Sequence, residues 1–313
     1  SRYSTLDQIN TSNVDQLNML WSFEPGLRDD IAQVTPLVVD GVMYLHSRAT
    51  MYALDATTGE ELWRRILDLG PANGPVRGST YAEGRVYAYR GADLYAFDAE
   101  TGAALASFGD AGFLKVVAQG LHHQYPDTYP TDIDPITIGY RLTTPPTFHD
   151  GIIYVAAALS EGHIPGGLVI AIDATTGAIQ WVFNTIPQTP RDSGWELAQE
   201  SWGTGARAGG GVWTPPAIDA QLGMVYVNAG NPSPDYDGSA RVGANLFSNS
   251  TIAIDMGTGK LRWHYQAVHH DLWDWDHVTG PLLFDVTTDN GELIKGVAAA
   301  GKNCLFYMWD RAT

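Results

Sequence analysis

The chain repeats one pattern of alternating apolar residues and turn residues five times. In its fullest form, over residues 51–63, the pattern reads Met-Tyr-Ala-Leu-Asp-Ala-Thr-Thr-Gly-Glu-Glu-Leu-Trp. The other copies span residues 94–106, 169–181, 251–263 and 307–313, and the last one stops before its glycine. Because a sequence that repeats is built from repeated structural units, one copy indicates the fold of the whole chain.

Each copy predicts strands joined by tight turns. The apolar alternation of the first copy ends at Asp55, and Thr58-Gly59 supplies the turn, since glycine tolerates the positive φ of a tight hairpin. Upstream, the turn at Asp40-Gly41 joins two more alternating strands. Each unit is therefore predicted to be a four-stranded antiparallel sheet. Three copies close with a tryptophan that we expect to pack between neighbouring sheets: Trp63, Trp181 and Trp263. The second copy has Ala106 at this position instead.

Such sheets arranged radially make a β-propeller. The predicted fold is all-β, with blades at about 33–65, 76–108, 142–183, 212–265 and 278–313. Two excursions, 109–141 and 184–211, show no sustained helical period. We expect them to be long functional loops over one face, with almost no helix elsewhere in the chain.

Composition agrees with this fold and excludes some functions. The chain has 34 glycines, 17 prolines and one cysteine, Cys304, so cysteine says little about the compartment. A net charge of −17 argues against a nucleic-acid partner, because phosphates require a positive surface. No run approaches the roughly 20 apolar residues of a membrane helix. The chain begins without a signal segment, so a targeting peptide is expected to be absent or removed.

The repeated signature resembles the tryptophan-docking repeat of the quinoprotein alcohol dehydrogenases that depend on pyrroloquinoline quinone (PQQ), an eight-bladed propeller family. The opening residues 2–4 and 6–11 look like the start of that family's mature domain. The resemblance implies that about five of eight blades are present. A ring lacking blades would leave two open sheet edges, so we expect further blades outside the chain or a closed homo-oligomer.

The resemblance also implies a function. Members of this family oxidise a primary alcohol to an aldehyde in the periplasm and pass electrons to an acceptor such as a cytochrome c. Trp213 matches the tryptophan under the quinone ring, and Arg77 matches the arginine that pairs with a PQQ carboxylate. Thr143 or Thr144 is expected to add a hydroxyl contact. Lys302 matches a position that holds a cation against the quinone oxygens during catalysis.

Three further matches imply a metal ion beside the quinone. Glu161 matches the family's metal-binding glutamate, Asn231 its asparagine ligand, and Asp274 the catalytic base that takes the alcohol proton. Their oxygens suit a hard cation, which would act as a Lewis acid while hydride passes to the quinone. The adjacent His269 and His270 are expected to point to opposite faces and not to share an ion.

Asp276 extends the metal prediction. Lanthanide-type relatives carry an aspartate two residues after the base, where calcium-type methanol dehydrogenases have a small residue. A further carboxylate favours a trivalent ion, so the sequence favours a lanthanide over Ca²⁺, although membrane glucose-dehydrogenase relatives share the Asp-x-Asp pattern. We expect the side chains of Glu161, Asn231, Asp274 and Asp276 to converge near the propeller axis, with Trp213 beside them.

Two alternatives stay open at this point. The family's adjacent cysteines, joined in a disulfide over the quinone, are replaced here by Pro71 and Ala72. This departure keeps a PQQ-dependent sugar or polyol dehydrogenase in view. The other alternative is a non-catalytic propeller scaffold that resembles outer-membrane assembly factors, which would have no reason to retain the quinone and metal residues together.

Overall fold

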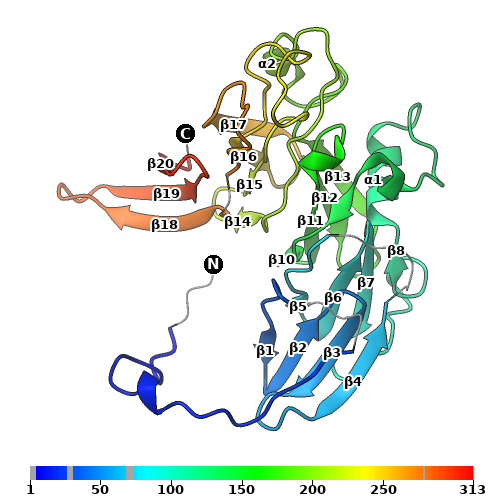
Figure 1. Ribbon diagram of the computed structural model, residues 1–313, viewed down its shortest axis with the longest axis vertical. Helices are drawn as coiled ribbons and strands as arrows, with labels where there is room; N and C mark the ends of the chain where they lie inside the picture. Colours follow the sequence, from blue (N-terminus) through cyan, green and yellow to red (C-terminus); the bar gives the residue numbers. More distant parts are fainter. Residues whose placement is uncertain (1–4, 27–30, 68–73, 278, 313) are drawn as a thin grey trace.

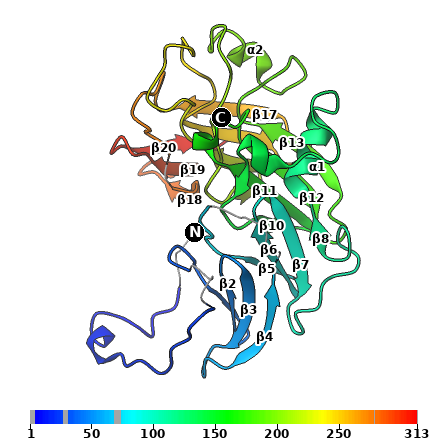
Figure 2. The same cartoon turned by 45° about the vertical axis from the view of Figure 1, so that its right-hand side comes forward.

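The computed structural model describes residues 5–26, 31–67, 74–277 and 279–312. The strands of these residues form five sheets that follow one another along an arc (Figures 1 and 2). Every strand within a sheet pairs antiparallel with its neighbours. The predicted all-β propeller architecture is confirmed.

The first two sheets lie at the N-terminal end of the arc. The first consists of β1 (Leu37–Val39), β2 (Val42–His46), β3 (Thr50–Asp55) and β4 (Glu61–Ile66). The second consists of β5 (Thr80–Ala82), β6 (Arg85–Arg90), β7 (Asp93–Asp98) and β8 (Phe113–Leu114).

The remaining three sheets continue the arc. The third consists of β10 (Thr147–His149), β11 (Ile152–Ala158), β12 (Leu168–Asp173) and β13 (Ile179–Asn184), with β9 (Arg141–Leu142) paired to β11. The fourth consists of β14 (Ala217–Asp219), β15 (Met224–Asn228), β16 (Ser250–Asp255) and β17 (Leu261–Gln266). The fifth has three strands among the described residues where the repeat predicts four: β18 (Leu282–Thr287), β19 (Leu293–Ala300) and β20 (Phe306–Asp310).

The first strands of neighbouring sheets lie against one another. β10 contacts both β5 and β14, and β14 contacts β18. These first strands form what we call the inner line of strands. Strand order within each sheet follows the sequence, so the chain passes from the inner line to the outer edge of one sheet and then returns to the inner line for the next sheet. Residues that precede each first strand therefore gather at one end of the inner line.

Tryptophan side chains dock each sheet onto the next. A Cβ added to Gly102, in the turn of the second sheet, would lie 2.6 Å from the Trp63 ring of the first sheet. The Trp63 indole also donates a hydrogen bond to the carbonyl of Ala99, at 2.9 Å. Glycine is required in this turn for two reasons: its φ of +67° disfavours other residues, and a side chain would occupy the space of the Trp63 ring.

The same contact recurs elsewhere. Trp181 of the third sheet covers Gly259 of the fourth, with 2.7 Å from the ring to an added Cβ, and donates to Met256 O at 2.9 Å. A further case, which the repeat does not predict, lies before the first sheet, where the Trp21 ring would lie 2.6 Å from a Cβ added to Gly59. The prediction of packing between sheets is therefore confirmed for Trp63 and Trp181. The third predicted tryptophan, Trp263 on the fourth sheet, donates to the carbonyl of Arg311 beside the fifth sheet at 3.4 Å.

The second sheet has Ala106 in place of a tryptophan, and a leucine makes the docking contact instead. Its outer strand is β8, further along the chain than the repeat predicts, and β8 brings Leu114 to the docking position. An added Cβ on Gly177 of the third sheet would lie 3.1 Å from Leu114 Cδ2. The backbone N–H of Gly109 donates to Thr176 O at 2.9 Å and completes the junction.

Repeat aspartates build the turns on which the tryptophans dock. The Oδ1 atom of Asp55 accepts hydrogen bonds from Thr57 N at 2.8 Å, Thr57 Oγ1 at 2.6 Å and Thr58 N at 2.9 Å. These bonds, those from Thr57 first, hold the pKa of Asp55 below its usual value. An aspartate is therefore needed to fold the turn, beyond marking the end of a strand.

The expectation that the two excursions are loops is wrong in part. The first contains α1 (Val116–Gln124) and the 3₁₀ helix η2 (Pro135–Ile138), and the second contains the short helix α2 (Trp195–Ala198). α1 packs on β12 and β13. Outside them lie the 3₁₀ helices η1 (Val14–Gln16) and η3 (Ser160–Gly162). No helix among the described residues combines the length and the hydropathy needed to cross a membrane.

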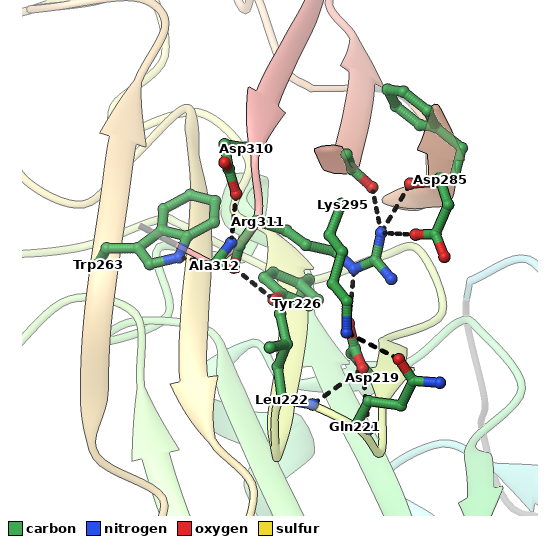
Figure 3. A network of polar contacts seen from close by, with 12 residues as sticks. Asp219, Gln221, Leu222, Tyr226, Trp263, Asp285, Lys295, Asp310, Arg311 and Ala312 are labelled. Atoms are coloured by element: carbon green, nitrogen blue, oxygen red, sulfur yellow. Dashed lines mark hydrogen bonds and ion pairs between the residues drawn. The ribbon is translucent and has the colours of Figure 1, made fainter. Parts of the chain in front are cut away.

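Arg311, just after β20, locks the fourth and fifth sheets together (Figure 3). Its Nε lies 2.5 Å from Asp219 Oδ2 on β14, and its Nη1 lies 2.7 Å from Asp285 Oδ1 on β18. The carbonyl of Arg311 accepts a hydrogen bond from the Tyr226 hydroxyl at 2.8 Å. The side chains of Arg311 and Asp219 are only 7% and 4% exposed, so this ion pair is buried.

Gly102→Ala tests the docking contact. Gly84→Ala is the matched control, because Gly84 has a φ of +75° but no atom within 4 Å of an added Cβ. Both changes should cost about 1–2 kcal/mol of unfolding free energy for backbone strain. Gly102→Ala should cost about 1–3 kcal/mol more, because its Cβ overlaps Trp63. Urea unfolding measures both, and equal losses would contradict the docking contact.

Arg311→Met should lower the unfolding free energy at pH 7 by about 3–5 kcal/mol, because it leaves the Asp219 carboxylate buried without its cation. Burial would raise the pKa of Asp219, but the hydrogen bond and charge of Arg311, together with the backbone N–H groups of Leu222 and Gln221, outweigh it and hold that pKa below its usual value. The stabilisation is therefore present above the unfolded pKa of about 3.9 and lost as the pH falls through the folded pKa.

The difference between wild type and Arg311→Met should accordingly shrink below about pH 4 in urea unfolding. Arg262→Met serves as the control, because its ion pair with Asp255 lies on the surface. That control should cost less than about 1 kcal/mol. A loss of similar size in both variants would show that the Arg311 pair contributes no special stabilisation.

Candidate functional site

The fold brings the predicted site residues to one end of the inner line of strands. Arg77, Thr144 and Trp213 precede β5, β10 and β14, the first strands of three successive sheets. In an antiparallel sheet, the start of the first strand and the end of the second lie at the same end. Glu161 follows β11, Asn231 follows β15 and Lys302 follows β19, and these are second strands. Both groups therefore face the same end of the propeller.

Trp213 and Arg77 form one half of the site. The Arg77 guanidinium carbon lies 5.2 Å from the centroid of the Trp213 ring, and Nη1 donates to Thr143 O at 3.0 Å. Burial lowers the pKa of Arg77. The hydroxyls of Thr143, Thr144 and Thr214 are buried without a hydrogen-bond partner in the described structure. Since buried polar groups are normally paired, this cluster fits a polar ligand beside a flat ring.

Close backbone contacts connect this half to the acidic half. The N–H of Gly211 donates to Ser160 Oγ at 2.9 Å, and the N–H of Gly230 donates to Gly211 O at 2.9 Å. An added Cβ on Gly230 would lie 2.8 Å from Asp276 Oδ1, so only glycine fits there without a shift. The segments of Glu161, Trp213, Asn231 and Asp276 thus pack directly on one another.

Lys302 joins the two aspartates of the acidic half. Its Nζ lies 2.8 Å from Asp274 Oδ2 and 2.9 Å from Asp276 Oδ2. The N–H of Lys302 also donates to Asp276 O at 2.9 Å, which fixes its turn against the aspartate segment. Burial would lower the pKa of Lys302, but the two carboxylates outweigh it and raise that pKa to about 12.

Asp276 is the most enclosed carboxylate of this group, with 4% of its side chain exposed. Its Oδ1 accepts a hydrogen bond from Asn231 N at 2.6 Å. Burial raises the pKa of Asp276 to about 6, and the charge of Asp274 acts in the same direction, against the lowering effect of Lys302. Any additional positive charge nearby stabilises the ionised form of a buried carboxylate of this kind.

Asn231 is buried and its amide is oriented by two hydrogen bonds. Nδ2 donates to Pro232 O at 3.1 Å and to Asp235 Oδ1 at 2.9 Å. Both amide hydrogens are used, which leaves the side-chain oxygen as the atom for a ligand. Asp235 is a site residue that the sequence analysis missed. Burial, followed by the charges of Glu161 and Asp274, raises its pKa. Its only sequence signal is its place in the same turn as Asn231.

The expected convergence is visible for some residues and not for others. One contact group is formed by Asn231, Asp274, Asp276 and Lys302. Glu161 on η3 is exposed, and its connection to this group is electrostatic, because its negative charge helps to raise the pKa of Asp235. In the described part of the chain, no three His, Cys, Asp or Glu side chains are arranged to hold a metal ion as they stand.

The donor atoms themselves nonetheless fit a hard cation. Asp274 Oδ1 is buried without a hydrogen-bond partner in the described structure, and the Asn231 oxygen lies in the adjoining turn. Carboxylate and amide oxygens are the ligands that such ions prefer. Pro71 and Ala72, the positions that replace the family's cysteines, lie outside the described residues.

Comparisons with known proteins identify the family of the chain. The family model for the glucose/ethanol/alcohol dehydrogenase beta-propeller domain (PQQ) matches residues 1–313. The chain is 32% identical to quinohemoprotein alcohol dehydrogenase ADH-IIG of Pseudomonas putida, over 100% of the chain and 43% of that protein. It is 29% identical to the quinoprotein glucose dehydrogenase of Escherichia coli K12, over 99% of the chain and 41% of that protein.

A solved structure of a europium-containing methanol dehydrogenase is also similar. It superposes with a TM-score of 0.80 at 27% identity, covering 100% of this chain and 54% of the other. The chain spans less than half the length of the two curated relatives named above. Because the family model covers the whole chain, the chain belongs to the family of PQQ-dependent glucose, ethanol and alcohol dehydrogenases.

Proposed function

We propose that the protein oxidises a primary alcohol to an aldehyde with PQQ as cofactor and Asp274 as the base. The observation that carries this proposal is the contact group of Asp274, Asp276 and Lys302 beside Asn231. Two carboxylates, a lysine and an amide oxygen lie together there, next to the segment of Trp213, and this grouping supports the proposal. When bound, PQQ supplies the hydride acceptor and a metal ion supplies Lewis acidity.

The residues of the chain divide the remaining work. Asp274 keeps Oδ2 on Lys302 and has Oδ1 free of protein partners, so its carboxylate can take the hydroxyl proton of the alcohol. Lys302, with its raised pKa, stays protonated and stabilises negative charge that develops nearby. Trp213 offers the flat surface for PQQ, and Arg77 with the unpaired hydroxyls of Thr143 and Thr144 offers polar contacts to its edge.

We further propose that Glu161, Asn231, Asp274 and Asp276 hold the metal, and that a lanthanide is favoured over Ca²⁺. Asp276 is the reason for this preference, because each added carboxylate increases the attraction for a trivalent ion more than for a divalent one. The similar methanol dehydrogenase structure contains europium. Asp235, beside Asn231, adds another negative charge to the same region.

A PQQ-dependent sugar or polyol dehydrogenase is the second candidate. It is favoured by the similarity to the E. coli glucose dehydrogenase. The ratio of kcat/KM values for ethanol, glycerol and glucose distinguishes the two candidates.

The named relatives are dehydrogenases, so the non-catalytic scaffold is not proposed. We propose a periplasmic location and electron transfer to an acceptor such as a cytochrome c.

Asp274→Asn in the full-length protein should lower kcat for the preferred alcohol at least about a hundredfold, because the general base is lost. PQQ should still bind, since Trp213 and Arg77 are unchanged. Steady-state assays with an artificial electron acceptor measure turnover, and the absorbance of bound PQQ measures occupancy. Asp237→Asn, an exposed aspartate near Asn231, is the control. Turnover of Asp274→Asn equal to that of the control would remove Asp274 from the mechanism.

Asp276→Asn tests the metal preference. It removes a negative charge with little change in shape, so Tb³⁺ affinity should fall at least about tenfold and Ca²⁺ affinity by a smaller factor. Tb³⁺ luminescence and competition with Ca²⁺ measure both constants without any turnover. An equal loss for the two ions would contradict a role for Asp276 in selecting a lanthanide.

A further inference from the structure

The loop that carries Asp274 is built around a buried carboxylate, Asp271, which has no exposed surface. Its Oδ1 accepts the N–H of Trp273 at 2.9 Å, and its Oδ2 accepts the N–H of Trp275 at 2.8 Å. These two amides lie on either side of Asp274, whose φ of +61° is left-handed and uncommon for a residue other than glycine. One carboxylate therefore holds the backbone N–H groups of both residues that flank Asp274.

Asp271 is itself anchored to the turn that carries Asn231. Its Oδ2 accepts a second hydrogen bond, from Asn249 Nδ2 at 2.7 Å. The backbone N–H of Asn249 donates to Gly230 O at 2.9 Å, and Gly230 directly precedes Asn231. The chain of contacts runs from the base loop, through Asp271 and Asn249, to the candidate metal ligand.

Arg241 forms a second buried link between the same two segments. It has no exposed surface, and its Nη2 donates to Asp271 O at 2.6 Å. Its Nε donates to Pro234 O at 3.0 Å, in the turn that follows Asn231. Burial lowers the pKa of Arg241, against the raising effect of the Asp271 charge. Arg241 thus joins the base loop to the turn of Asn231 through two backbone carbonyls.

We propose that Asp271 is a positioning residue for the reaction: it sets the place of Asp274 relative to Asn231 and thereby the geometry of the metal and base site. It acts through the amides of Trp273 and Trp275 and touches neither substrate nor cofactor. The inference rests on the proposed roles of Asp274 and Asn231. Groups of this kind, which orient direct ligands, change metal affinity or activity about 10–100-fold when they are replaced.

The chain offers a matched control in Asp192, another buried aspartate that organises a loop. Its carboxylate accepts hydrogen bonds from Gln124 Nε2 at 2.6 Å, Tyr125 OH at 3.0 Å and the N–H of Gln188 at 2.7 Å. None of these partners belongs to the candidate site. Asp192→Asn therefore has the structural cost of losing a buried carboxylate without any effect on the base loop.

The experiment compares Asp271→Asn with Asp192→Asn in the full-length protein. The readouts are the thermal midpoint, the dissociation constant for Tb³⁺ from its luminescence, and kcat and KM with PQQ bound. Both variants should lose thermal stability. Only Asp271→Asn should weaken Tb³⁺ binding, by about 10–100-fold, and lower kcat by a similar factor while KM for the alcohol changes little. Asp192→Asn should keep its Tb³⁺ affinity within about twofold of wild type.

Asn249→Gly is a milder variant for the case in which Asp271→Asn fails to fold. Glycine accepts the φ of +47° at this position while the hydrogen bond to Asp271 is removed. A several-fold loss of Tb³⁺ affinity in this folded variant supports the proposal. Unchanged affinity and kcat in either folded variant, or an equal loss in Asp192→Asn, overturns it. Full turnover in Asp274→Asn would instead refute the proposed function itself, so the two failures are distinct.

Discussion

The structure depends on the docking of an aromatic ring of one sheet onto the turn glycine of the next. Trp63 on Gly102 and Trp181 on Gly259 each combine a buried ring with an indole hydrogen bond to the backbone. The same residue types therefore join the first sheet to the second and the third sheet to the fourth. Leu114 takes the place of the tryptophan between the second and third sheets. Together these contacts join the sheets into an arc in which first strands of neighbouring sheets lie side by side.

The site is a consequence of that arrangement. Its residues come from segments as far apart as Arg77 and Lys302, yet each segment joins a sheet at the same end of the inner line of strands. Loops there carry the chemistry, whereas the sheets provide the rigid support. The buried ion pair of Arg311 with Asp219 holds together the fourth and fifth sheets, which carry Asn231 and Lys302.

The sequence predicted the features that depend on local pattern. Alternation and turn residues define the strands, and the repeat predicts the docking tryptophans. The substitute contact of Leu114 could not be predicted, because β8 is a two-residue strand outside the repeat. Asp235, Asp271 and Arg241 were also missed. Their importance comes from hydrogen bonds to distant segments, and a lone aspartate or arginine in a loop gives no sign of such partners.

The central claim is that the group of Asn231, Asp274, Asp276 and Lys302 is the metal and base site of a PQQ-dependent dehydrogenase. The most direct test is X-ray diffraction from the full-length protein crystallised with PQQ and Tb³⁺, using the anomalous signal of the ion. The account predicts a single strong peak about 2.5 Å from oxygens of Glu161, Asn231, Asp274 and Asp276, with the quinone against Trp213. A peak elsewhere, or PQQ bound away from Trp213, would contradict it.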